Sequence, residues 1–178
     1  MNQTLHPPQL FLLLGTLCMA LLMRWQGAPL SSVPESAAGI VSFELARTKA
    51  QASAIRNAWG ETEAAPLVQI AIQNTRLDFA FILFYMLFLY VGATVTVVPL
   101  PSKLGTVAGY TGLLILIAAL MDVIENGLML YQLQHRITSV TAMATFIAAT
   151  LKFVLLLLCA LWIIFTALLR FFTAVPTA

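Results

Sequence analysis

The residues best suited to chemistry in this chain are charged and polar side chains set within apolar sequence. Asp122, Glu125 and Asn126 form an Asp-Val-Ile-Glu-Asn run flanked by apolar residues, and Lys152 lies in the next apolar block. Offsets of three and four place the three residues of the run on one face of a helix. Carboxyl groups and an ammonium in such a setting can pair with each other, bind or relay protons, or hold a polar ligand.

These side chains are predicted to share one level of the molecule, because each residue advances an α-helix by about 1.5 Å. Glu125 precedes a turn near Thr138 by 13 residues and Lys152 follows that turn by 14, so we expect the two to face each other. Asp78 precedes a turn near Ser102 by 24 residues and Glu125 follows it by 23. The predicted intramembrane polar cluster therefore comes from three helices and comprises Arg76, Asp78, Asp122, Glu125, Asn126 and Lys152.

Three interpretations of this cluster stay open. The first is an ion-pair and hydrogen-bond network that fixes the register of the helices. The second is a functional site that contacts a polar ligand, a proton path or a charged residue of a partner subunit, since ionisable residues inside a membrane are suspected of function by default. The third is a divalent cation held by the carboxylates. Lys152 and Arg76 would compete with such a cation, so no metal site is predicted.

No other residue set points to catalysis. Cys18 and Cys159 lie in separate apolar blocks without a Cys-x-x-Cys partner, and His6 and His135 lie at the ends of predicted helices. Thiol exchange, bis-histidine haem and Ser-His-Asp chemistry are therefore not indicated. Tyr85 is interpreted as a packing residue. We expect no enzymatic activity, no catalytic residues and no cofactor.

The composition identifies the environment of these side chains as lipid. Hydrophobic residues make up 61% of the 178 residues and charged residues 9%, whereas a soluble domain carries about 25% charged residues. The apolar residues are gathered into blocks long enough to cross a bilayer as helices. The net charge of +2 is too small to indicate a nucleic-acid partner. The chain is predicted to be an all-α membrane protein.

Four transmembrane helices are expected, over residues of about 8–25, 76–98, 104–134 and 141–172, within a single membrane domain that covers 1–178. No basic residue precedes the first block, as a secretory signal would require, so we expect that block to be a retained span. Short connections follow the second and third spans. They make neighbouring helices antiparallel, in an up-and-down bundle.

An extramembrane region is expected over about 26–75, with one short amphipathic helix in it. Apolar residues recur there at spacings of three and four, while Glu44 and Gln51 fall on other faces, and Gly60 is a natural stop. The helix is predicted to lie on the membrane surface, on the bundle or on a partner. Its apolar side forms a docking stripe of Val41, Leu45, Ala52, Ile55 and Trp59.

Several short motifs are spread over most of the chain: Ser42-Phe-Glu-Leu-Ala46 followed by Trp59, Leu77-Asp-Phe79, Asp122-Val-Ile-Glu-Asn126 and Leu151-Lys-Phe153. With these motifs the chain resembles small bacterial four-helix inner-membrane proteins. The resemblance implies the fold and a multi-pass setting in the bacterial inner membrane. It implies no activity.

Two functions follow as expectations. The first is a non-enzymatic accessory or scaffold subunit of a larger membrane complex, such as an energy-transducing one, with membrane lipids and other membrane-protein subunits as partners. The second is a small oligomeric carrier or proton-coupled transporter that uses Glu125 or Asp122.

The basic residues beside the spans predict the orientation. Arg24, Arg76 and Arg136 flank the loops after the first and third spans, against Lys103 and Arg170 on the other side. Loops rich in basic residues face the cytoplasm. Both termini are therefore predicted to be periplasmic.

Overall fold

The computed structural model describes residues 7–60, 67–95 and 102–173. Within these ranges all regular structure is helical, and four helices are long and apolar enough to cross a membrane. They are α1 (Pro7–Gly27), α4 (Leu67–Val95), α5 (Ser102–Gln134) and α6 (Ser139–Thr173). The all-α membrane fold predicted from the composition is confirmed.

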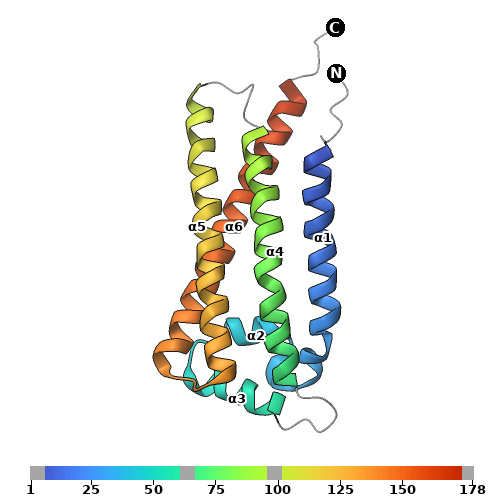
Figure 1. Ribbon diagram of the computed structural model, residues 1–178. Coiled ribbons are helices and arrows are strands. Elements are labelled where there is room, and N and C mark those ends of the chain that lie inside the picture. The colour runs from blue at the N-terminus through green and yellow to red at the C-terminus, as the bar shows by residue number, and fades with distance from the viewer. Residues whose placement is uncertain (1–6, 61–66, 96–101, 174–178) are drawn as a thin grey trace.

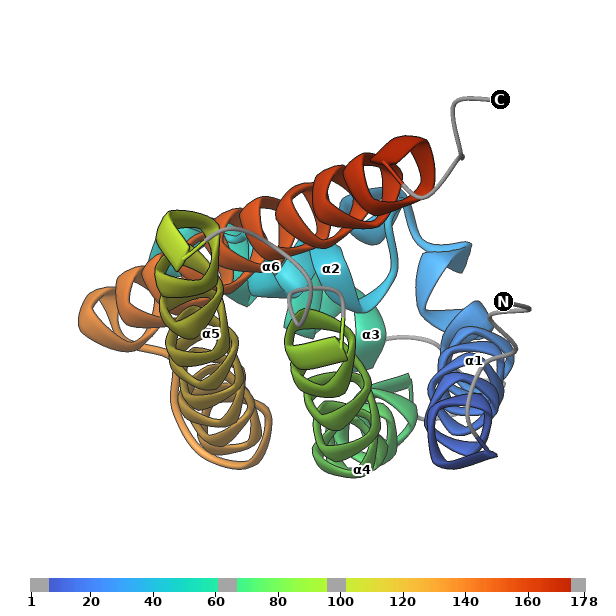
Figure 2. The ribbon, with the colours of Figure 1, turned by 90° about the horizontal axis from the view of Figure 1, so that it is seen from above.

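The long helices pack in chain order. α4 lies against α1 on one side and α5 on the other, and α5 packs along α6, while contact between α4 and α6 is sparse. Seen from above, α5, α4 and α1 stand side by side and α6 crosses one face obliquely (Figure 2). The start of α1 and the end of α6 lie on the same side of the molecule, opposite α2 and α3 (Figure 1).

α1 is joined to α4 by a polar clasp near its lower end. The Asn74 amide donates to the Met23 carbonyl (2.9 Å) and to Gln26 Oε1 (2.7 Å), while Gln26 Nε2 donates to the Ile70 carbonyl (3.0 Å). Higher up, a Cβ at Gly15 would overlap the Phe84 ring, so a larger residue there would force this ring to move. No residue of α1 is buried, so the helix is a peripheral member of the bundle.

The prediction of one amphipathic helix across the stripe is wrong, because the structure has two shorter helices there. Two 3₁₀ turns, η1 (Ala28–Ser32) and η2 (Pro34–Ser36), are followed by two separate helices, α2 (Ile40–Glu44) and α3 (Lys49–Gly60). The break has a local cause in a reciprocal cap. The Gln51 N–H donates to Thr48 Oγ1 and the Thr48 N–H donates to Gln51 Oε1, each at 3.2 Å. This Thr-x-x-Gln capping box starts a new helix after Thr48.

The break divides the predicted docking stripe. Ala52, Ile55 and Trp59 of α3 are buried against the lower ends of the long helices, whereas Val41 is half-buried and Leu45 is 41% exposed. Because α2 is a separate turn, its buried positions are Phe43 and Glu44 instead. The buried part of the stripe therefore contacts the protein's own bundle.

Trp59 anchors the segment that follows α1, which we name the cap (residues 28–60). Its indole Nε1 donates to Ser36 Oγ (2.9 Å) and to the Leu30 carbonyl (3.2 Å), and its ring lies 5.5 Å from that of Phe43. From the outer face of α3, Arg56 donates to the carbonyl of His135, next to the end of α5 (2.9 Å). The cap thus closes one end of the helix bundle and presents α2 to its interior.

Candidate functional site

Lys152 is the centre of the charged residues. Its Nζ lies 2.7 Å from Asp122 Oδ1, 2.7 Å from Glu125 Oε2 and 3.6 Å from Glu44 Oε2. α6 provides the ammonium, α5 two carboxylates one helical turn apart, and α2 the third. One cation therefore joins two spans and the cap.

Two neutral side chains complete the polar contacts. The Tyr85 hydroxyl donates to Asp122 Oδ2 and the Asn126 amide donates to Asp78 Oδ2, each at 2.7 Å. Both donors compensate carboxyl oxygens that Lys152 does not reach. We name the whole group the acid–lysine centre: Glu44, Asp78, Tyr85, Asp122, Glu125, Asn126 and Lys152.

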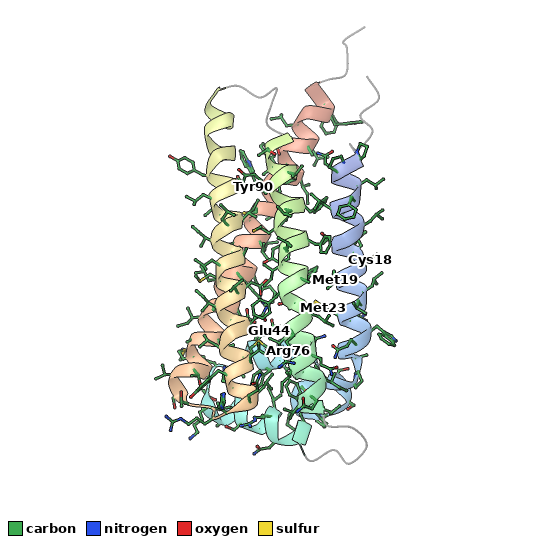
Figure 3. All side chains as sticks on the ribbon, in the orientation of Figure 1. Cys18, Met19, Met23, Glu44, Arg76 and Tyr90 are labelled. Carbon is green, nitrogen blue, oxygen red and sulfur yellow. The ribbon has the colours of Figure 1, made fainter. Side chains whose placement is uncertain are left out.

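The acid–lysine centre lies just inside the end of the bundle that the cap covers. Asn74, in the clasp at the end of α1, precedes Asp78 by one helical turn, which corresponds to a rise of about 6 Å. Figure 3 shows Glu44 at this lower end, among the side chains between α2 and the long helices. All seven side chains are buried, with Glu125 at 0% and Lys152 at 4% exposure. The layer is thus closer to the cap than to the opposite end of the molecule.

The structure brings together most of the side chains that the sequence pointed to. The predicted contact between Glu125 and Lys152 is confirmed at 2.7 Å, and Asp122 is an equally close partner. Arg76 is different, because it is exposed and has no part in the cluster. It stands two residues before Asp78, and helical residues two apart do not face each other.

Two members of the acid–lysine centre were missed. Tyr85 is predicted from the sequence to be a packing residue. It follows Asp78 by seven residues, however, and so shares the face of α4 that carries Asp78. The apolar pattern predicts that Glu44 lies on a face away from the stripe. That prediction is valid only if one helix continues past Glu44, and α2 ends there. The Thr48 capping box, which ends that continuity, is the signal that would have corrected it.

The centre does not resemble a cation site. Within the described ranges, no three His, Cys, Asp or Glu side chains are placed to hold a metal ion. The Lys152 ammonium lies among the carboxylates and takes the place that a divalent cation would need. The arrangement therefore gives the divalent-cation interpretation no support.

The charges of the acid–lysine centre do not balance. It holds four carboxyl groups and one ammonium, so full ionisation would leave a charge of 1 − 4 = −3 in a buried site. Apart from the ion pairs with Lys152, no donor among the described residues reaches either oxygen of Glu125 or Oε2 of Glu44. A buried ionised carboxylate without donors is costly, and protonation removes that cost. The chemistry best suited to this arrangement is proton binding.

Glu44, which lies in α2 outside the four long helices, also favours the protonated form of its carboxyl group. Burial raises the pKa of its carboxyl above the ordinary value of 4.5. The Lys152 ammonium lowers the pKa and the Asp122 carboxylate raises it, and the balance remains on the raised side. The docked cap therefore favours a protonated Glu44.

Comparison of the chain with protein-family models, with curated proteins and with solved structures gives no match.

Removal of the shared cation should destabilise the protein more than removal of one of its partners. Lys152→Met leaves the carboxyl groups without a counter-ion, and breaking a buried pair in this way costs about 3–5 kcal/mol in soluble proteins. Glu125→Gln should be milder, because Asp122 still pairs with the ammonium. Thermal melting in detergent should also show that the double variant loses less than the sum of the single losses. Strict additivity would contradict direct pairing.

Docking of the cap should weaken as the pH rises. With its pKa raised in the folded state, Glu44 contributes full stability below its unfolded pKa of 4.5, and that contribution is lost as the pH passes upward through the raised value. Glu44→Gln, which imitates the protonated acid, should keep the cap docked at high pH. Hydrogen exchange of residues 40–60, corrected for its intrinsic pH dependence, measures this. The exposed Glu35→Gln is the matched control and should behave as the parent protein does.

Proposed function

We propose that this multi-pass membrane protein is a small proton-coupled carrier without enzymatic activity, and that Glu125 is its proton-binding group. The observation that carries the proposal is the acid–lysine centre, in which three buried carboxyl groups share one ammonium and a fourth, Asp78, is buried beside Asn126. A purely structural ion pair needs one carboxylate for one lysine. The surplus of carboxyl groups is what a site for protons requires.

The contacts divide the roles within the centre. Asp122 is held by Lys152 at one oxygen and by Tyr85 at the other, so both of its oxygens are compensated in the ionised form. Glu125 has one oxygen, Oε2, 2.7 Å from Lys152 Nζ, whereas no donor among the described residues reaches its other oxygen, Oε1. The Asp122–Lys152 pair is thus the permanent charge pair, and Glu125 is the group that gains and loses a proton.

The accessory or scaffold subunit is the second candidate. The docking stripe gives this candidate little support, because its buried part packs against the protein's own bundle. A different observation favours it: α1 packs chiefly on α4 and buries no residue, so its remaining faces are open to lipid or to another subunit. A stable stoichiometric complex after purification in mild detergent would favour this candidate.

We further propose that the protein resides in the bacterial inner membrane with its termini in the periplasm. The resemblance to bacterial inner-membrane proteins supports the location. Basic residues gathered at the cap end support the orientation, because such residues favour the cytoplasmic side. They are Arg24, Arg47, Lys49, Arg56 and Arg136.

Labelling from outside the cell tests this orientation. Ser32 is exposed in the cap, so Ser32→Cys in a Cys18→Ser background should resist an impermeant thiol reagent in intact cells and react after permeabilisation. Reaction in intact cells would place the cap in the periplasm and reverse the proposal.

Infrared spectroscopy tests proton binding at the centre. A protonated carboxyl group has a C=O stretching band that an ionised carboxylate lacks, so a pH titration of the purified protein should show one such band that Glu125→Gln removes. Glu35→Gln, an exposed carboxyl in the cap, should leave the buried-acid band unchanged. A spectrum in which Glu125→Gln removes no band would contradict the proposal.

A further inference from the structure

Glu44 is the member of the acid–lysine centre that does not belong to a span. α2 has five residues and ends at Glu44, so this carboxyl enters the bundle from the extramembrane side. It remains 7% exposed, whereas Glu125 is fully buried. A proton that reaches Glu125 from the water beside the cap therefore meets Glu44 at the boundary.

The surroundings of Glu44 suit transfer between two acids. Glu44 and Glu125 flank the same ammonium, because Glu44 Oε2 lies 3.6 Å and Glu125 Oε2 lies 2.7 Å from Lys152 Nζ. The charged groups that act on it are Lys152 from α6, Asp122 and Glu125 from α5, and Asp78 from α4. Two adjacent carboxylates repel each other, but a single proton placed between them gives a hydrogen bond.

Asp78 is a less suitable route although its exposure, 8%, is similar. One of its oxygens is occupied by the Asn126 amide at 2.7 Å. Of the two partly exposed acids, Glu44 is the one that shares the Lys152 ammonium with Glu125.

We propose that Glu44 relays protons between the water on the cap side and Glu125. The ionised Glu44 takes a proton from water, its O–H then donates toward a Glu125 carboxylate oxygen, and the proton moves to Glu125 and leaves Glu44 ionised again. Release follows the same steps in reverse, with no change in charge or proton count beyond the one proton exchanged with water. This relay rests on the proposed function.

Time-resolved infrared measurement after a rapid pH jump tests the relay in the full-length protein in detergent. Glu44→Gln cannot accept a proton, so the Glu125 band should still reach its final amplitude but about 100-fold more slowly, the lower end of what a positioned acid–base group contributes. Glu44→Asp keeps a carboxyl on a shorter stem and should give an intermediate rate. If the glutamine variant does not fold, the aspartate variant alone decides, because an unchanged rate there would overturn the relay. Glu35→Gln should keep the parent rate.

The outcomes separate this inference from the proposed function. A Glu125 band that forms at the parent rate in Glu44→Gln overturns the relay and leaves proton binding at Glu125 in place. A parent protein with no band that depends on Glu125 overturns the proposed function and the relay together. A band of normal amplitude that forms slowly only in the Glu44 variants supports both.

Discussion

The structure depends on one buried ammonium shared among carboxylates from different elements. Lys152 holds Asp122 and Glu125 at 2.7 Å and Glu44 at 3.6 Å, and so joins α6 to α5 and to the cap. In lipid, helices gain little from apolar contact with one another, because the lipid tails are equally apolar. A charged contact that lipid cannot replace is therefore what sets the register of α5 against α6. The apolar contacts of the cap are then added at one end of that pair.

The surplus of acid over base gives the same centre a second property. If each carboxyl were paired with its own cation, the layer would be inert across a wide pH range. Three carboxyl groups around one ammonium, with a fourth buried nearby, cannot all stay ionised without large cost, so the number of protons held becomes a variable of the folded state. Because Glu44 lies in the cap and Glu125 in α5, the number of bound protons links the cap to the interior of the bundle.

Part of this arrangement could be predicted from the sequence, and the reasons differ from residue to residue. Glu125 and Lys152 could be paired because two straight helices joined by a short turn have a fixed rise, so counting from the turn gives their level. Arg76 shares that level but points away, which depth alone does not reveal. Glu44 could not be placed without the break at Thr48, a capping box of four residues that overrides the apolar pattern running from Val41 to Trp59. The packing of the cap on the bundle depends on contacts between distant segments, such as Trp59 with Leu30 and Ser36, which no local pattern encodes.

The sharing of Lys152 also bears on how the chain enters the membrane. Asp122 and Glu125 are synthesised before Lys152, and α5 and α6 are separated by only the residues 135–138. A charged residue near the centre of a lone helix costs about 2.5–3.5 kcal/mol to insert, and α5 alone would carry two such residues without their cation. Insertion of α5 and α6 together, as a hairpin in which acids and base enter already paired, avoids that cost. The short connection that makes the two helices neighbours in the finished protein thus also makes them a single unit during its assembly.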